Sequence, residues 1–279
     1  MNSKRLWIGF ILVMVISFGI LGYFGREIYR QAPPIPEKIV TPDGTVVFTS
    51  ADIKDGQNVW QSMGGQEVGT IWGHGAYKAP DWTADWLHKE ALFILDTWSL
   101  AEFSKSYDDL KDENQALLQK RLQNELRENT YDETSKSLVI SKVRAEAIKS
   151  NSAFYSGLFM NGSELAELRE AYAIPAYSIK EKARMDKMNA FFFWASWATV
   201  TERPEKDITY TNNWPPEKLV GNEPTGSLLL WTGFSVIILL FGIGLLGWYY
   251  ATNREEETNP DNGFTLGISG LVSSSRLVA

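Results

Sequence analysis

Two long uncharged segments interrupt an otherwise mixed pattern of apolar and polar positions. The first runs from Leu6 to Phe24 and the second from Gly226 to Ala251. A helix rises about 1.5 Å per residue, so each segment is long enough to cross the roughly 30 Å hydrocarbon core of a bilayer. We predict transmembrane helices over residues 6–25 and 226–251. We interpret the first as an uncleaved signal anchor, because no small-residue cleavage site follows it.

Positive charge beside these segments predicts the side of the membrane that each part occupies. Lys4 and Arg5 precede the first segment, and Arg254 follows the second. Short flanking loops rich in Lys and Arg stay in the cytoplasm. We therefore expect a two-pass protein of the cytoplasmic membrane. Residues 1–5 and the tail 252–279 would be cytoplasmic, and residues 26–225 would form a domain on the extracytoplasmic, periplasmic side.

The stretch between the segments has the periodicity of helices joined by loops. We predict a helix from Thr83, its capping residue, to Ser104. The apolar face of this helix consists of Leu87, Ala91, Ile94, Trp98 and Ala101. Residues 105–150 are charged and helix-prone, and we predict two helices here, divided by a turn at Asn129–Thr134. Their inward stripe consists of Leu117, Leu118, Leu122 and Leu126.

Shorter patterns complete the expected fold, which is mainly α with a small β-hairpin. The prolines from Pro33 to Pro36 predict an extended lead, and Pro-Asp-Gly at 42–44 between β-branched runs predicts the hairpin. Further helices are expected over 51–62, from Ser163, and over 180–200. The apolar run at 189–200 is too short to cross a bilayer, so we expect it in the core or against the lipid surface.

The composition excludes several classes of function. The formal net charge is −7, so nucleic acid is not an expected partner, because phosphate binding needs clustered Lys and Arg. The chain has no cysteine, which excludes disulfides, Cys-ligated zinc, iron–sulfur clusters and the thioether attachment of a c-type haem.

The remaining metal-ligating residues are sparse. A site made of His74, Asp81, Asp85 and His88 matches no standard ligand spacing, so we interpret both histidines as hydrogen-bonded structural residues. Met185 and Met188 are assigned to core packing, since no Cys pair is present to attach a porphyrin. We predict no catalytic, cofactor-binding or metal-binding residue in this chain.

A glycine- and tryptophan-rich string carries a family resemblance. Residues 56–90 read GQNVWQSMGGQEVGTIWGHGAYKAPDWTADWLHKE, and TNNWPP follows at 211–216, just before the second apolar segment. In this order the motifs resemble the N-terminal region of quinol-dependent nitric oxide reductases, large-subunit respiratory enzymes of the haem–copper oxidase superfamily. The resemblance covers about residues 5–250.

The resemblance implies a domain like a cytochrome c that has lost its haem, with bulky side chains in the vacated space. We expect those side chains to be Trp60, Trp72, Tyr77, Trp82 and Trp86. Complete members use quinol electrons to reduce nitric oxide to nitrous oxide, in anaerobic respiration, denitrification or nitric oxide detoxification. Their membrane core holds haem b, haem b3 and a non-haem iron. The implied partners are the lipid bilayer, that catalytic core and quinol.

The tail departs from the family, because residues 252–279 contain no histidine and do not resemble its continuation. We therefore expect the chain to be non-catalytic alone, as a truncated or frameshifted product, a gene fragment or a split subunit. A helix–domain–helix layout also fits an extracytoplasmic sensor or interaction module, which the short tail disfavours. A free-standing enzyme is disfavoured because no intramembrane histidine is available to hold haem iron.

Overall fold

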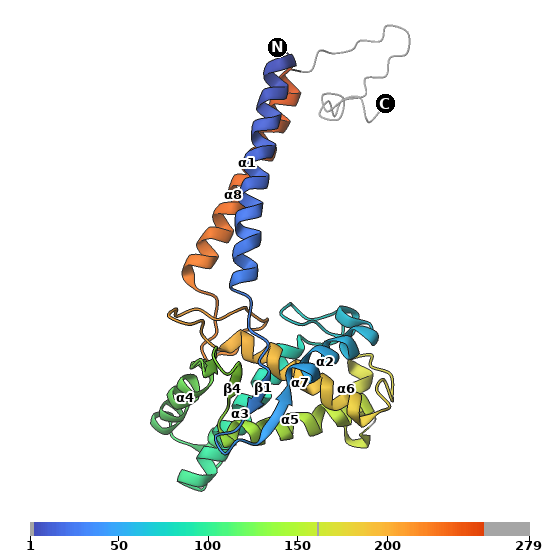
Figure 1. Ribbon diagram of the computed structural model, residues 1–279, viewed down its shortest axis with the longest axis vertical. Helices are drawn as coiled ribbons and strands as arrows, with labels where there is room; N and C mark the ends of the chain where they lie inside the picture. Colours follow the sequence, from blue (N-terminus) through green and yellow to red (C-terminus); the bar gives the residue numbers. More distant parts are fainter. Residues whose placement is uncertain (1–2, 161, 254–279) are drawn as a thin grey trace, which may run out of the picture. The chain divides into compact units, whose positions relative to one another are not determined.

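The computed structural model describes residues 3–160 and 162–253 (Figure 1). The chain divides into two compact units, Met1–Glu223 and Pro224–Ala279. The first unit contains helix α1 and a mainly helical domain with a small sheet, and the second contains helix α8. The mainly α fold predicted from the sequence is therefore confirmed.

Among the described residues, two helices are long and apolar enough to cross a membrane. They are α1 (Ser3–Arg30) and α8 (Gly226–Asn253), and their candidate spans are Trp7–Arg30 and Gly226–Thr252. Neither span is buried inside its unit. Helix α1 continues past the predicted end at residue 25, and within this extension Glu27 pairs with Arg30 one turn later, at 3.4 Å.

Residues 31–37, which follow α1, form neither helix nor strand, and this proline lead lies against the domain. The indole Nε1 of Trp194 donates a hydrogen bond to the carbonyl oxygen of Pro34 at 2.9 Å. Helix α7, which carries Trp194, runs through the centre of the domain, so this bond joins the proline lead to the core.

The predicted hairpin is present and belongs to a larger sheet. Strands β1 (Lys38–Val40) and β2 (Val46–Thr49) are antiparallel, and Asp43 in the turn accepts a hydrogen bond from Thr45 N at 3.2 Å. Strands β3 (Tyr131–Asp132) and β4 (Ser137–Val139) complete the order β2-β1-β4-β3, with β4 parallel to β1. The segment predicted as a turn at Asn129–Thr134 therefore contains the first strand of a second hairpin.

The described part of the domain also contains six helices, and their positions follow the predicted pattern closely. They are α2 (Ser50–Ser62), α3 (Trp82–Phe103), α4 (Asp112–Arg127), α5 (Lys142–Met160), α6 (Ala166–Ala171) and α7 (Lys182–Val200). Short 3-10 turns lie at Gly65–Val68, Tyr107–Asp109 and Ser163–Leu165. The helix expected from Ser163 thus opens with the last of these turns and continues as α6.

Three details of the helices were predicted wrongly. Asp81, rather than Thr83, caps α3, because its carboxylate accepts hydrogen bonds from the backbone N–H groups of Thr83 and Ala84. Leu117 is exposed, since the buried face of α4 is formed by Leu118, Leu122 and Leu126. Ala101 is exposed as well, in the last turn of α3.

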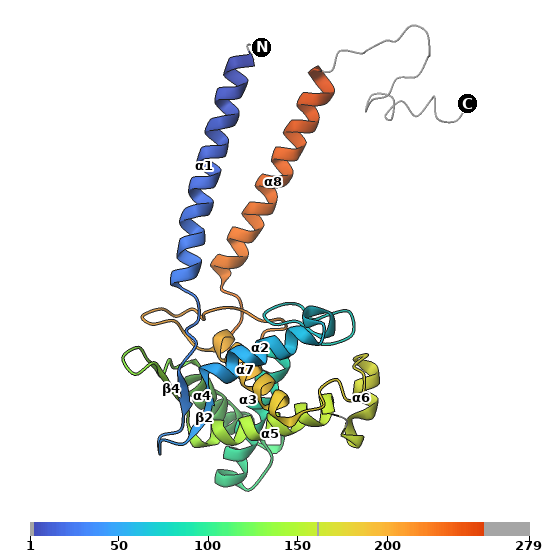
Figure 2. The ribbon, with the colours of Figure 1, turned by 45° about the vertical axis from the view of Figure 1, so that its right-hand side comes forward.

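Helix α7 forms the centre of the core, and it contacts α2, α3 and α5 (Figure 2). Every residue from Asn189 to Val200 is buried. Of the two expected positions, the core or the lipid surface, the structure shows the core. Gly56 on α2 permits the close approach of α7: a Cβ at this position would lie 2.0 Å from the carbonyl oxygen of Lys187.

Candidate functional site

A cluster of stacked aromatic rings lies where α3, α5 and α7 meet. Trp86 stacks on Tyr155 with ring centroids 5.3 Å apart and planes 1° from parallel. One turn earlier, Trp82 stacks on Phe192 at 5.9 Å and meets the edge of Phe159 at 5.4 Å. All five side chains are fully buried. Such ring pairs each contribute about 0.5–1.5 kcal/mol beyond burial of their area, so the cluster joins the three helices firmly.

A buried ion pair borders the ring cluster. The guanidinium Nε of Arg144 on α5 donates to the Glu90 carboxylate on α3 at 2.6 Å, and both side chains are almost completely buried. The indole Nε1 of Trp86 donates to the other carboxylate oxygen at 3.2 Å. Both oxygens of Glu90 are thus hydrogen-bonded, which is what a charge away from water requires.

A second carboxylate, that of Asp85, holds the tyrosine of the cluster. The hydroxyl of Tyr155 donates to Asp85 at 2.5 Å, and Lys89 binds the other oxygen of this carboxylate at 2.9 Å. Burial raises the pKa of Tyr155 well above its ordinary value, and the nearby negative charge of Asp85 raises it further. Tyr155 is therefore a neutral hydrogen-bond donor inside the domain.

Asp81 fixes the loop at residues 70–81, which joins the first 3-10 turn to α3. Besides capping α3, its carboxylate accepts hydrogen bonds from Thr70 Oγ1 at 2.7 Å and from Gly73 N at 2.6 Å. Gly69 precedes the loop with φ +119°, and a Cβ there would lie 2.1 Å from the Trp82 indole nitrogen. These hydrogen bonds to Asp81 and the close approach of Gly69 to Trp82 therefore stabilise the loop that contains the string IWGHGAYKAPD.

The five aromatic residues predicted to fill the domain interior divide into three groups. Trp60, Trp82 and Trp86 are buried in the core. Trp72 is partly buried, and its indole Nε1 donates to the carbonyl oxygen of Ala195 on α7 at 2.8 Å. Tyr77 is fully exposed, so its predicted packing inside the domain is wrong. Tyr77 lies on the solvent side of the loop at residues 70–81. A tyrosine in a loop can be buried or exposed, so its residue type does not predict which.

The candidate metal ligands do not come together. His88 pairs with Glu217 at 2.6 Å, and His74 lies against the ring of Trp214 with centroids 5.6 Å apart. Asp81 and Asp85 are engaged as described above. Within residues 3–160 and 162–253, no three His, Asp or Glu side chains are grouped as a metal site. The interpretation of His88 as a hydrogen-bonded structural residue is confirmed.

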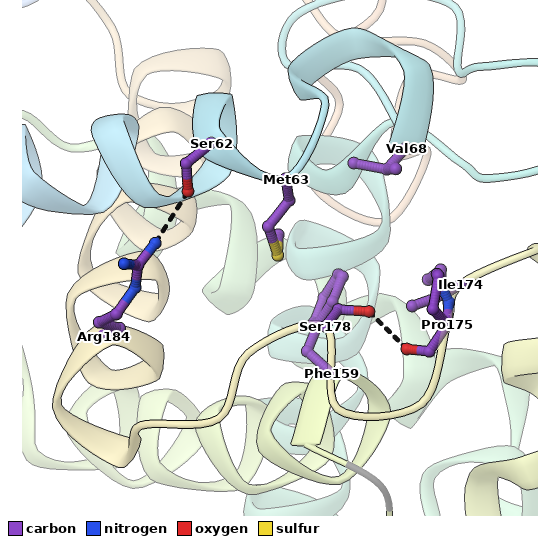
Figure 3. Close-up of a pocket in the computed structure, with 8 residues that line it drawn as sticks. All are labelled: Ser62, Met63, Val68, Phe159, Ile174, Pro175, Ser178 and Arg184. Atoms are coloured by element: carbon purple, nitrogen blue, oxygen red, sulfur yellow. Dashed lines mark hydrogen bonds between the residues drawn. The ribbon is translucent and has the colours of Figure 1, made fainter.

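A small hollow of about 240 Å³ lies at the end of α2 (Figure 3). On one side of it, Arg184 on α7 donates to Ser62 at 2.8 Å, and Ser178 donates to the carbonyl oxygen of Pro175. The other lining side chains are those of Met63, Val68, Phe159 and Ile174. Both hydroxyl groups of the hollow are already paired with protein partners, so the Arg184 guanidinium is the group left to orient a ligand there.

Comparison with known families decides what this arrangement belongs to. Residues 36–216 match the family of the NorB cytochrome c-like domain of nitric oxide reductase. The chain belongs to this family. The match begins within the proline lead and ends in the WPP motif, so it covers nearly all of the domain between α1 and α8. No curated protein matches the chain.

The residues of this cytochrome c-like domain do not fit the haem that the family name suggests. A c-type haem is attached through cysteine thiols, and the sequence has no cysteine. Met185 and Met188 are completely buried among apolar side chains, which supports their assignment to packing. The centre of the domain is occupied by the stacked rings of Trp82, Trp86 and their partners. A thioether-attached haem therefore has no place in this domain.

Several residues of the cluster were not found from the sequence. Tyr155, Phe159 and Phe192 lie on other helices than Trp82 and Trp86, and Arg144 is far from Glu90 along the chain. The sequence offered two signals: the apolar run of α7 and the charged Glu90 on the otherwise apolar face of α3. Neither signal identifies which residue of another helix contacts Trp82, Trp86 or Glu90.

Proposed function

We propose that this chain is the membrane-anchored N-terminal part of a quinol-dependent nitric oxide reductase. In this proposal α1 and α8 span the cytoplasmic membrane, and the domain at 26–225 lies on the extracytoplasmic side, with residues 1–5 and 252–279 in the cytoplasm. The observation that carries it is the family match over 36–216 between two helices of membrane-spanning length.

The proposed role of the domain is structural. In complete enzymes of the family that the chain resembles, haem b, haem b3 and a non-haem iron lie in a separate membrane core, where nitric oxide is reduced to nitrous oxide with quinol electrons. This chain would supply none of the iron ligands and would cover the outer face of that core. Trp60, Trp72, Trp82 and Trp86 would take the volume that a haem occupies in a cytochrome c, and this filling keeps the domain rigid without a cofactor.

The loop at 70–81 is the proposed contact with the catalytic core. Its backbone is fixed through Asp81, yet Tyr77 is fully exposed and the nearby motif residue Trp214 is half exposed. Rigid, exposed aromatic side chains are typical anchors of protein interfaces, because they lose little conformational entropy on binding. The positive charge of Lys78, also exposed, lies beside Tyr77 in this loop.

Co-purification tests the proposal. The tagged full chain, expressed in its source cells in the presence of nitric oxide, is expected to capture a second polypeptide with a haem b spectrum and quinol-dependent nitric oxide consumption. Tyr77→Ser should lower the captured haem about tenfold, as loss of an interface anchor does. Tyr177→Ser, which changes an exposed tyrosine in the turn between α6 and α7, is the matched control.

The same chain purified from a host without the reductase is expected to show no Soret band and no nitric oxide consumption. Turnover of nitric oxide by that lone chain would contradict the proposal. Capture of a signalling kinase in place of a haem protein would favour the sensor instead.

A further inference from the structure

Two adjoining hollows lie at the C-terminal end of α1, near Arg30, where its candidate membrane span ends. We call this region the foot of α1. The first has a volume of about 560 Å³ and is bounded by Phe24 and Ile28 of α1 and by Trp72. The second, of about 460 Å³, shares Arg203 and Tyr210 with the first. Small-molecule sites commonly have volumes of about 300–1,000 Å³, so either hollow can hold a headgroup.

Arg203, which lines both hollows, carries a positive charge that is not paired with a carboxylate. Arg203 is partly buried, and its guanidinium donates to the carbonyl oxygens of Thr209 at 3.1 Å and Tyr210 at 2.8 Å, and to the side-chain oxygen of Gln31. Among the described residues, no Asp or Glu oxygen lies within 4.0 Å of it. A guanidinium carries five N–H donors, so these three bonds fix its position and leave donors for an anion.

The neighbouring groups add positive charge at the same place. Lys206 is exposed, and its ammonium lies 3.4 Å from the Gln31 oxygen that Arg203 also binds. Two carboxylates line the hollows. Glu27 of the first accepts hydrogen bonds from Gln31 and, at 3.4 Å, from Arg30, and Glu133 lines the second. Four cations, those of Arg30, Lys136, Arg203 and Lys206, line the second hollow, so cations outnumber acids. The charge offered to a ligand by Arg203 and Lys206 is therefore positive.

The α1 side of the hollow is apolar and exposed. Phe24 and Ile28 are 59% and 71% accessible, so more than half of each residue's surface is available for contact. A ligand that satisfies both walls has a hydrocarbon part along α1 and a negatively charged group against Arg203. An anionic phospholipid has this arrangement at the level where a transmembrane helix meets water.

We propose that the foot of α1 is a binding site for one phospholipid with an anionic headgroup. The phosphate lies against Arg203 and Lys206, and an acyl chain follows Phe24 and Ile28. The inference rests on the proposed function in one respect, namely that α1 spans a membrane. It does not depend on the catalytic core.

Native mass spectrometry of the full chain tests the site. The chain is reconstituted in vesicles of equal parts phosphatidylglycerol and phosphatidylcholine, extracted gently, and its retained lipids are counted. The wild type is expected to retain phosphatidylglycerol in clear excess. Each cation near an anionic lipid surface is worth about 1 kcal/mol, or about fivefold, so Lys206→Gln should lower the retained ratio about fivefold and R203Q/K206Q about 25-fold.

The controls separate charge at this site from charge in general and from folding. K120Q/K149Q removes two lysines from α4 and α5, away from the hollows, and should leave the ratio unchanged. Arg203→Lys removes the guanidinium, which binds the 209–210 segment, but keeps the positive charge. This variant should therefore keep the preference for phosphatidylglycerol. A wild type that retains the two lipids in their bulk proportion would overturn the proposal, and so would a preference that K120Q/K149Q also abolishes.

Two further outcomes are distinguishable. Displacement of the retained phosphatidylglycerol by inorganic phosphate at physiological concentration would mean that the site binds the phosphate group alone, and the lipid assignment would be wrong. A chain that fails to float with the vesicles would show that α1 and α8 do not enter a bilayer, which contradicts the proposed function itself. A chain that floats but shows no headgroup preference contradicts the lipid site only.

Discussion

The Glu90–Arg144 ion pair lies almost completely inside the domain. Both charges lie away from water, and their separation of 2.6 Å is that of a strong charge-assisted bond. The net contribution of such a pair to folding is small, because desolvation offsets most of the attraction. Removal of one partner is costly, since it leaves the other charge buried alone.

We therefore predict that Glu90→Gln lowers the free energy of unfolding by about 3–5 kcal/mol, measured by denaturant titration of the full chain in mild detergent. Glu102→Gln is the control: Glu102 pairs with Arg121 at 2.6 Å, but both side chains are about half exposed. Exposed pairs contribute about 0–1 kcal/mol. Equal losses in the two variants would contradict the argument.

Tyr155 predicts a weakness of the domain at alkaline pH. Burial raises the pKa of Tyr155 in the folded state well above the value of about 10 that an unfolded tyrosine has. The folded state therefore holds this proton more tightly, and its stabilisation is complete below pH 10 and is lost as the pH rises through the raised pKa. Burial also raises the pKa of Tyr107, Tyr172 and Tyr210, in the same direction.

We predict that Tyr155→Phe reduces the loss of stability above pH 10, while it lowers stability at neutral pH by about 1–2 kcal/mol because the bond to Asp85 is lost. Denaturant titrations at neutral and alkaline pH measure both effects. Tyr177→Phe, at a half-exposed position, is the control and should change neither. An alkaline loss of the same size in Tyr155→Phe and the wild type would show that Tyr155 does not cause it.

At the scale of elements, the packing of α2 on α7 depends on a residue without a side chain. A Cβ on Gly56 would lie 2.0 Å from Lys187 O and 2.8 Å from the Cβ of Phe191, and backbone atoms of a central helix cannot move away cheaply. The usual gain of about 1 kcal/mol from Gly to Ala in a helix is therefore reversed here.

We expect Gly56→Ala to lower the free energy of unfolding by about 2–3 kcal/mol, as overpacking of a core does. Gln57→Ala is the matched control on the exposed face of the same helix and should change stability by no more than about 0.5 kcal/mol. Thermal unfolding of the full chain in detergent compares the two. A stabilised Gly56→Ala variant would mean that α2 and α7 have room between them for an added methyl group.

The helices and the first hairpin were predictable because their signals are local. Pro-Asp-Gly gives a turn between β1 and β2, and the apolar period gives α3, α4 and α7. Strands β3 and β4 were missed, because they are too short for alternation to be visible and β4 is defined by its pairing with β1, far away in the sequence. Asp81 and Thr83 are both common N-cap residue types, and the structure shows that Asp81 caps α3 while it also binds the preceding loop.

The candidate site was predictable in part for the same reason. The spacing of Trp82 and Trp86 places both rings on one face of α3, which is a local property. Their stacking on Phe192 and Tyr155 is a contact between elements, and no pattern within one helix encodes it. Tyr77 was assigned to the interior because it belongs to the same motif as the tryptophans, whereas the structure exposes it fully.

For the whole molecule, the proposed two-pass arrangement makes a topological prediction. Reporter fusions at Lys111, in the domain, and after Ala251, at the end of α8, are expected to report opposite sides of the membrane. The reason is that one apolar helix of spanning length separates the two points. A reporter active only in the periplasm and one active only in the cytoplasm should give complementary signals at the two positions. Equal signals would remove the second span.

The hydrogen bond from Trp194 to Pro34 has a mechanical consequence. This bond joins the proline lead that follows α1 to the central helix α7. A force on α1 is therefore transmitted to the core of the domain, because the short, stiff lead cannot lengthen to absorb it. In the proposed arrangement α1 spans the membrane, and bilayers of different thickness tilt a spanning helix by different amounts. Lipid composition is therefore expected to change how readily this domain unfolds.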